Sequence, residues 1–405
     1  MQQLSAPGEG RIIRIASRGD GVTADGLHVA GAAPGDLVNA DGEVVERGPH
    51  HASPPCRHYG RCGGCQLQHV DDAAYRAFIS DRIRHALAQQ GISAPDMEEP
   101  HLSPAGCRRR ASLRVQKRQG RVVLGFNEGE SHRLVDIAEC PVLDPVLFAL
   151  VEPLRKLSSR LFAERSAGGI TLTRCDQGVD VLIGPVTADG LGALEAMTDF
   201  AVKHGLARLS VDRGYGAELV HMPDAPTISF DGIPVALPPS AFLQATVDGE
   251  RALVSAVQRS VAGARRIADL FAGLGTFSLP LSRQAHVTAV DAAGNAMEAL
   301  QQAANRFQRP VTARHRDLFR APLDMKELQP FDAVVVDPPR AGARAQVEMI
   351  ARSAVPRAVM VSCNPNSFAR DAKALVDAGF RLERLWPVGQ FRWSIHVELV
   401  ASFER

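Results

Sequence analysis

Hydrophobic positions in the carboxyl-terminal part of the chain come in short runs, each followed by a turn and a helix-like stretch. Short apolar runs that alternate with helical segments are typical of buried parallel strands in an open α/β sheet. The pattern therefore predicts a Rossmann-like sheet in a domain spanning 246–405. The expected strands are 265–270, 286–290, 312–317, 331–336 and 358–361, with a closing pair at 382–386 and 397–403.

The amino-terminal half shows two other patterns. Residues 8–50 hold short apolar stretches broken by glycine and proline, which predict a small OB-type β-barrel within 1–50. Such a barrel could bind RNA or could simply cap the chain. Residues 51–245 mix helical and strand-like stretches and predict an α+β domain. Within it, the apolar spacing over 71–91 predicts an amphipathic helix that could pack on the carboxyl-terminal domain.

Length and composition exclude several classes of protein. A chain of 405 residues favours two or three domains. No apolar run reaches the length of a membrane span, and residues 1–5 lack the basic and apolar regions of a signal peptide. We therefore expect a cytoplasmic monomer without a membrane partner.

A cationic stretch is the one local feature that favours nucleic acid, since the net charge is only +1. Residues 108–121 include seven cationic residues and no acidic residue. Apolar and polar positions alternate there, so one face of a strand could present the cations to a phosphate backbone. A solvated charged face is the alternative interpretation. The candidate RNA-binding residues are Arg108, Arg109, Arg110 and Arg114.

Three cysteines on one short loop indicate a metal or cluster site. Cys56, Cys62 and Cys65 are separated by five and then two residues, and the glycines between the last two let backbone amides approach the sulfurs. A tetrahedral or cubane site needs a fourth ligand, for which Cys140 is the best candidate. Four thiolates suit zinc and an iron–sulfur cluster equally, so the spacing does not separate them.

Cys363 lies between an apolar run and an expected helix, at a strand-to-helix turn. In open α/β sheets such turns collect ligands and reacting groups, and a helix amino-terminus stabilises a thiolate. These features make Cys363 a candidate nucleophile. The alternative is a buried, inert cysteine, which is the commoner case.

A glycine turn at Gly273 and Gly275 follows the first expected strand, and Asp291 ends the second. The turn lacks the spacing of a dinucleotide fingerprint, and an acidic residue at 291 could accept ribose hydroxyls, so the adenosine part of S-adenosylmethionine fits better. The segment 337–339, Asp-Pro-Pro, resembles the loop of methyltransferases that act on exocyclic amines. Arg340 stands where those enzymes normally carry an aromatic residue.

A cysteine one strand after this loop suits methylation of a ring carbon. A thiolate that adds to C6 of uracil makes C5 nucleophilic, and a base must then remove the C5 proton. Glu398, on the last expected strand, could be that base, although a surface acid is the commoner role for glutamate.

Together these segments resemble the RNA uracil-C5 methyltransferase family, whose members use S-adenosylmethionine to make 5-methyluridine in rRNA and tRNA. The resemblance covers nearly the whole chain in collinear order, from a TRAM-like amino-terminal barrel to the last strand. It is carried by the cysteine loop, Arg108-Arg109-Arg110-Ala111, Glu139-Cys140-Pro141, Phe242-Leu243-Gln244, Asp269-Leu270-Phe271, Asp337-Pro338, Ser362-Cys363-Asn364-Pro365 and His396-Val397-Glu398.

The resemblance implies Cys363 as nucleophile and Glu398 as base. It also implies a [4Fe–4S] cluster on the four cysteines named above, and RNA as the partner, with 23S rRNA favoured over tRNA. The cofactor contacts that it implies are Gln244, Phe271, Thr276, Asp291, Asp317 and Asp337.

The chain departs from the family pattern at several positions. The barrel is short, and Gln244-Ala245-Thr246 stands where the family has Gln-x-Asn. Thr276, Asp291 and Asp317 stand where asparagine, glutamate and asparagine are frequent. Three alternatives remain open at this point: a tRNA uracil-C5 methyltransferase, an exocyclic-amine N-methyltransferase, and an RNA-binding metalloprotein without activity.

Overall fold

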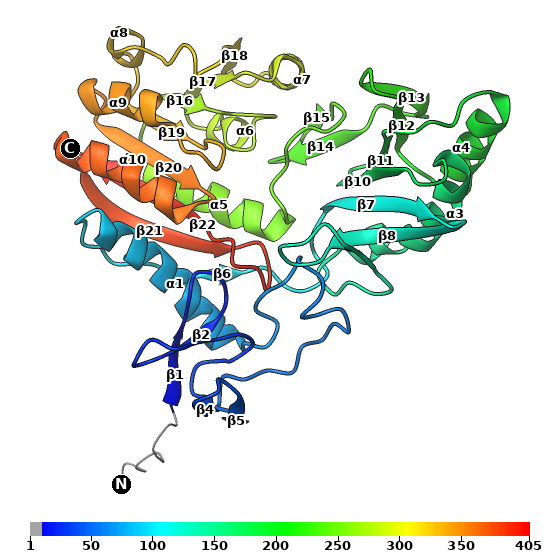
Figure 1. Cartoon of the computed structure of the whole chain (residues 1–405). Helices are drawn as coiled ribbons and strands as arrows, with labels where there is room; N and C mark the ends of the chain where they lie inside the picture. Colours follow the sequence, from blue (N-terminus) through cyan, green and yellow to red (C-terminus); the bar gives the residue numbers. More distant parts are fainter. Residues whose placement is uncertain (1–9) are drawn as a thin grey trace.

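The largest sheet lies in the carboxyl-terminal half of the chain (Figure 1). The structure, a computed structural model, describes residues 10–405, so the first nine residues of the expected barrel lie outside the described part. The sheet has the order β18-β17-β16-β19-β20-β22-β21-β6, with β16 to β20 parallel and β22 antiparallel to its neighbours. This confirms the predicted α/β sheet. The strands are β6 (His101–Leu102), β16 (Arg266–Leu270), β17 (His286–Asp291), β18 (Val311–His315), β19 (Ala333–Val336), β20 (Arg357–Ser362), β21 (Arg381–Gly389) and β22 (Glu398–Glu404).

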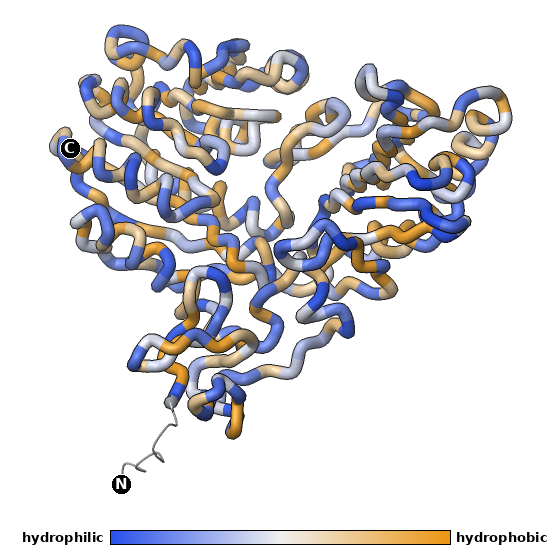
Figure 2. Tube along the Cα trace, in the orientation of Figure 1, coloured by the Kyte–Doolittle hydropathy of each residue, from blue (hydrophilic) through white to orange (hydrophobic). Residues whose placement is uncertain are grey.

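Both faces of this sheet are covered, as the continuous apolar runs require. Along β20, Ala358 and Met360 belong to one hydrophobic cluster, whereas Val359 and Val361 belong to the other. Figure 2 shows hydrophobic and hydrophilic stretches alternating along the chain. The covering helices are α5 (Val247–Ser260), α6 (Ser278–Leu281), α7 (Gly294–Arg306), α8 (Met325–Leu328), α9 (Arg344–Arg352) and α10 (Pro365–Asp377).

A second sheet forms the central domain, in the order β13-β12-β11-β10-β7-β8-β9. On β7 the buried residues Ala111, Leu113 and Val115 alternate with exposed Ser112 and Arg114, so the cationic stretch does form a two-sided strand. The elements are β7 (Arg110–Arg118), β8 (Arg121–Asn127), β9 (Leu134–Asp136), α2 (Pro145–Phe148), α3 (Val151–Leu161), β10 (Ala167–Cys175), β11 (Gly178–Gly184), α4 (Leu191–Lys203), β12 (Arg208–Asp212) and β13 (Ala217–His221).

Two helices, α2 and α3, occupy most of residues 145–161. Pro153 lies in the first turn of α3. Proline is tolerated there because it has no N–H to donate, but deeper inside a helix it would remove a hydrogen bond and clash with the preceding turn. A new helix therefore begins just before it.

The amino-terminal segment folds as a five-stranded sheet with the order β3-β2-β1-β4-β5. Its core is small and consists of Ile12, Val29, Ala32 and Val38, with Val44 packed against it. Within the described residues β3 and β5 do not pair with each other, so the segment is a half-barrel. The strands are β1 (Gly10–Ile15), β2 (Gly21–Thr23), β3 (His28–Val29), β4 (Leu37–Val38) and β5 (Val44–Glu46).

Two segments from the range 51–245 pack on the carboxyl-terminal sheet, and the first of them is the helix for which the sequence allowed this position. Helix α1 (Asp72–Gln89) packs against α10 and β21, and the strand β6 that follows it pairs with β21. The hairpin of β14 (Thr227–Phe230) and β15 (Ile233–Ala236) contributes Phe230 and Val235 to the same core as α5 and α7. The carboxyl-terminal sheet is therefore covered by more than one stretch of chain, including segments that precede residue 246.

Across residues 10–405, no helix has the length and apolarity needed to cross a membrane.

Candidate active site

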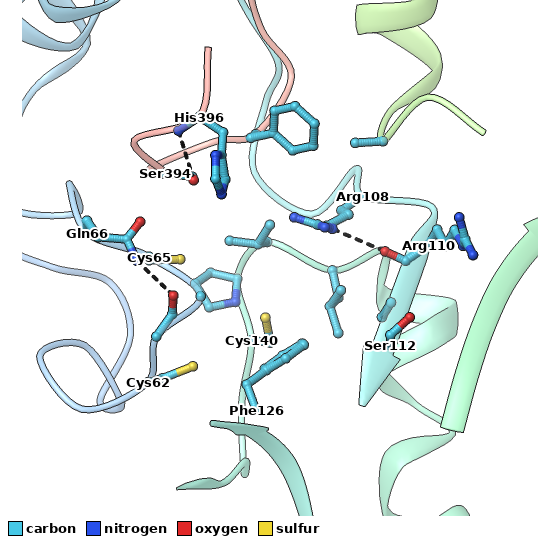
Figure 3. A pocket seen from close by; sticks show the side chains of 18 of the residues that line it. Cys62, Cys65, Gln66, Arg108, Arg110, Ser112, Phe126, Cys140, Ser394 and His396 are labelled. Carbon is cyan, nitrogen blue, oxygen red and sulfur yellow. Dashed lines mark hydrogen bonds between the residues drawn. The ribbon is translucent and has the colours of Figure 1, made fainter. Parts of the chain in front are cut away.

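A cavity of about 660 Å³ opens between the carboxyl-terminal sheet and the central domain. Residues from both sides of the molecule line it, which brings together many of the predicted site residues. In Figure 3, Cys62, Cys65 and Cys140 lie on one side, Arg108 and Arg110 on another, and His396 above them. The site residues among the lining are Cys56, Cys62, Cys65, Arg108, Arg110, Cys140, Gln244, Arg340, Cys363 and His396.

Cys363 follows β20 and precedes α10, as the sequence predicted. Asn364 caps the helix by accepting a hydrogen bond from the N–H of Asn366. The pKa of the Cys363 thiol is nevertheless raised to about 11, first by burial and then by the nearby carboxylates of Glu398 and Asp337. The expectation that the helix would stabilise a thiolate is therefore wrong for the free protein, because burial and the acidic neighbours outweigh the helix dipole.

Glu398 is the first residue of β22 and is 3% exposed. Burial raises the pKa of its carboxyl group to about 7, against the opposing effect of a hydrogen bond from Gln390. Nε2 of Gln390 donates to Oε2 of Glu398 at 2.8 Å. A carboxyl group that titrates near neutral pH can act as a general base.

A chain of amide groups links Glu398 to Asp337. Gln390 also donates through Nε2 to Oε1 of Gln244 at 2.7 Å, and Nε2 of Gln244 reaches Oδ2 of Asp337 at 3.4 Å. The backbone N–H of Ala245 donates to Oε1 of Gln390 at 2.8 Å. No motif in the sequence marks Gln390. Its partners lie 145 residues and more away along the chain, except Glu398, so only the fold reveals its place.

The candidate cofactor residues lie at the carboxyl ends of neighbouring strands. Phe271 follows β16 with a φ of +62°, Asp291 ends β17, and Asp317 follows β18. Asp291 accepts hydrogen bonds from the N–H groups of Gly273 at 3.0 Å and Ala293 at 2.7 Å, which fixes the glycine turn. Asp317 accepts hydrogen bonds from the N–H groups two and three residues further on. Thr276 lies in the same turn as the two glycines, half-buried.

Two observations at these strand ends fit a bound adenosyl group. Gly273 has open space where a side chain would stand, so a ligand can approach its backbone. Oδ1 of Asp269 is buried without a hydrogen-bond partner, and burial raises the pKa of this carboxyl group to about 7. The pKa of Asp337 is raised well above its usual value by burial and by the neighbouring acids.

The cysteine loop does not form a site for a single metal ion. In the part of the chain that the structure describes, no group of three or more His, Cys, Asp or Glu side chains could hold one. The four thiols still line one cavity. Burial raises the pKa of Cys62, Cys65 and Cys140, and the neighbouring cysteines raise it further.

The four candidate RNA-binding arginines have different surroundings. Arg108 and Arg110 line the cavity, and Arg114 lies exposed beside it on β7. Arg109 is 3% exposed, pairs with the buried carboxylate of Glu250, and donates through Nε to the carbonyl of Gln244 at 3.0 Å. The prediction that Arg109 binds RNA is therefore wrong. Arg109 holds the Gln244 segment in place and is too deeply buried to reach a phosphate group.

An open parallel sheet with this glycine turn and these strand-end acids defines the class of S-adenosylmethionine-dependent methyltransferases. Residues 240–405 match the family model described as tRNA (Uracil-5-)-methyltransferase. An RNA methyltransferase of Zymomonas mobilis, described as uncharacterized, is 47% identical over 98% of this chain and 99% of its own. The 23S rRNA (uracil(1939)-C(5))-methyltransferase RlmD of Halomonas elongata is 35% identical over 99% of this chain and 91% of its own.

The fold is similar to that of a solved enzyme. The tRNA (uracil-54, C5)-methyltransferase of Pyrococcus abyssi, in complex with S-adenosyl-L-homocysteine, superposes with a TM-score of 0.73 over 98% of this chain and 100% of its own, at 22% identity. The chain belongs to the family of S-adenosylmethionine-dependent RNA uracil-C5 methyltransferases. The exocyclic-amine and non-enzymatic alternatives are therefore wrong.

Proposed function

We propose that this enzyme methylates a uridine of 23S rRNA through a covalent bond between Cys363 and the uracil ring, with Glu398 as the base. One observation carries the mechanism. Cys363 lines the cavity shared with the central domain, and the carboxyl group of the buried Glu398 is near enough to help raise the pKa of its thiol. A nucleophile and a base at one site are what C5 methylation of uracil requires.

The target uridine would turn out of its RNA structure into the cavity. The thiol proton of Cys363 passes to solvent water in the open cavity, the sulfur forms an S–C6 bond, and the electron pair of the C5–C6 double bond moves toward O4. Bound S-adenosylmethionine supplies an electrophilic methyl group for C5. Glu398 then takes the C5 proton, the S–C6 bond breaks, and the double bond and the thiolate return.

We propose that the cofactor binds at the carboxyl ends of β16 to β19. The open backbone at Gly273 and the unpartnered oxygen of Asp269 support this position. The residues proposed to hold it are Gln244, Phe271, Thr276, Asp291, Asp317 and Asp337.

We propose a [4Fe–4S] cluster on Cys56, Cys62, Cys65 and Cys140. Four cysteine thiolates on one wall of the cavity are the donor set that such a cluster would take. Iron and sulfide analysis of anaerobically purified protein tests this proposal. Zinc alone would contradict it.

The choice of 23S rRNA rests on the Halomonas relative, whose name gives uracil 1939 as its target. The family model and the Pyrococcus enzyme are named for tRNA, so tRNA is the second candidate. Either RNA would contact Arg108, Arg110 and Arg114 around the cavity, in the cytoplasm. Mapping 5-methyluridine in rRNA and tRNA from a deletion strain separates the two: we expect one site to be lost from 23S rRNA, and a loss confined to tRNA would contradict the proposal.

Glu398→Gln tests the mechanism directly. Without a base the methylated ring keeps its C5 proton, so the S–C6 bond cannot break. We expect a covalent protein–RNA adduct that survives a denaturing gel and is absent from the double variant that also carries Cys363→Ala. Turnover of Glu398→Gln at the wild-type rate, with no adduct, would remove Glu398 from the mechanism.

A further inference from the structure

Gln390 lies at the centre of the buried amide chain, yet the proposed reaction gives it no role. Its side chain is 1% exposed, and its oxygen and both of its N–H groups have partners. The oxygen accepts from the N–H of Ala245, whereas the two N–H groups donate to Glu398 and Gln244. A buried amide with every group satisfied has a single defined orientation.

The direction of this chain is fixed by the backbone. A backbone N–H can only donate, so the oxygen of Gln390 must face Ala245 and its NH2 group must face Glu398 and Gln244. Gln244 must then turn its own oxygen toward Gln390, which leaves its NH2 group for Asp337. One amide thus determines which groups Gln244 and Glu398 present to the site.

Helix α5 leaves room for this side chain. Gly249 lies in its first turn, and a Cβ there would stand 2.7 Å from Cβ of Gln390 and 2.7 Å from Oγ1 of Thr246. Glycine is a poor helix former, so its presence in a helix usually reflects close approach of another group. The local sequence therefore accommodates Gln390 at the expense of helix propensity.

We propose that Gln390 is a positioning residue that keeps Glu398 ionised for removal of the C5 proton and fixes the amide of Gln244 toward Asp337. A neutral N–H donor favours the carboxylate over the carboxylic acid, because its hydrogen bond to the negatively charged group is the stronger of the two. This inference rests on the proposed function, in which Glu398 is the base.

Gln390→Met is the main test, since it keeps the side-chain length and removes both donors. The readout is tritium release from RNA carrying 5-³H-uridine in a single turnover, measured against pH. Loss of the donor to Glu398 should shift the rising limb of this profile to higher pH by about 1 to 2 pH units. At pH 7 the rate of tritium release should fall by about 10 to 100-fold. The methylated covalent adduct should accumulate below that limb.

Gln346→Met is the matched control. Gln346 is also 1% exposed and makes two buried hydrogen bonds, both to the backbone of Leu323 and away from the cavity. We expect it to lose stability as Gln390→Met does, but to keep the wild-type pH limb. Gln390→Glu is the second variant: it keeps the volume and the acceptor for Ala245, and its added carboxylate should move the limb at least as far.

Two outcomes separate this inference from the proposed function. If Glu398→Gln blocks tritium release but neither Gln390 variant moves the pH limb, Gln390 only fills space and the inference is wrong. If Glu398→Gln releases tritium at the wild-type rate, the assignment of the base fails first, and with it the proposed mechanism.

Discussion

Both walls of the cavity carry cysteine, but the neighbours of the cysteines differ between the two walls. On the central-domain wall, four cysteines lie together, and burial and their own neighbours raise the pKa of three of them. On the catalytic wall, Cys363 stands alone beside buried carboxyl groups. Burial raises the pKa on both walls, so burial does not decide the role of a cysteine here. Grouped thiols suit a shared ligand, whereas a single thiol beside a base suits a bond that forms and breaks.

The largest effect on activity should come from removing the sulfur of Cys363 on the catalytic wall. Cys363→Ala should lower methyl transfer by at least about 10⁴-fold, because the proposed mechanism depends on the bond between this sulfur and C6. Binding of S-adenosylmethionine, measured by calorimetry, should persist, since the cofactor residues are untouched. If the alanine variant still methylated RNA, Cys363 would not be the nucleophile.

Cys140→Ser should remove most of the iron and destabilise the central domain, because a cluster with three protein ligands is held weakly. The measurement is iron content together with the thermal unfolding midpoint. Cys107→Ser is the control, since this cysteine lies outside both groups and donates to the carbonyl of Pro104. Equal iron in both variants would mean that the grouped cysteines hold no cluster.

Arg109 joins the two walls, because it leads into β7 and binds Glu250 and the Gln244 segment. Arg109→Met leaves the carboxylate of Glu250 buried without its partner, which should cost about 3 to 5 kcal/mol of unfolding free energy. Arg114→Met, on the exposed face of the same strand, should change stability little and weaken RNA binding instead. Chemical denaturation and a filter-binding assay measure the two effects. If Arg109→Met weakened RNA binding while Arg114→Met lowered stability, Arg109 would be an RNA-binding residue after all.

Glu398 should destabilise the fold above neutral pH. Its carboxyl pKa is about 7 in the folded protein against 4.5 for an ordinary glutamate, so the stability it contributes is complete below pH 4.5 and is lost as pH rises to 7. As the pH rises from 4.5 to 8, the free energy of unfolding of Glu398→Gln should therefore increase relative to that of the wild type, by at most about 3 kcal/mol. Denaturant midpoints at both pH values measure this gain, and Glu404→Gln, exposed on the same strand, should show none. A constant difference between wild type and Glu398→Gln would contradict the raised pKa.

The sequence predicted the features that depend on neighbours in the chain. Apolar runs located the strands of the catalytic sheet, and the turn before Asn364 placed Cys363 between a strand and a helix. Helix α1 begins and ends close to the predicted bounds because Asp71 caps it and Gly91 follows it. These signals are local, so no knowledge of the fold was needed.

Features that depend on distant partners could not be predicted. Arg109 reads like its two neighbours, but its partner Glu250 lies 141 residues further on. Gln390 has no local signature, and the raised pKa of Cys363 comes mainly from burial and from acids on other strands. In each case the sequence gives the residue type, and only the packing determines whether the group faces solvent or the protein interior.

The position of α1 and β6 also affects how the protein can be made. Tyr75 on α1 donates to the carbonyl of Ser394 at 3.0 Å, across 319 residues of chain. During synthesis the first pieces of the catalytic sheet thus leave the ribosome long before the strand that they join, while the central sheet has all of its strands by residue 221. The central sheet can fold on the growing chain, but the catalytic unit can close only after the last residues have been added. A chain cut short near its end would therefore hold a folded central sheet and an open, inactive catalytic sheet.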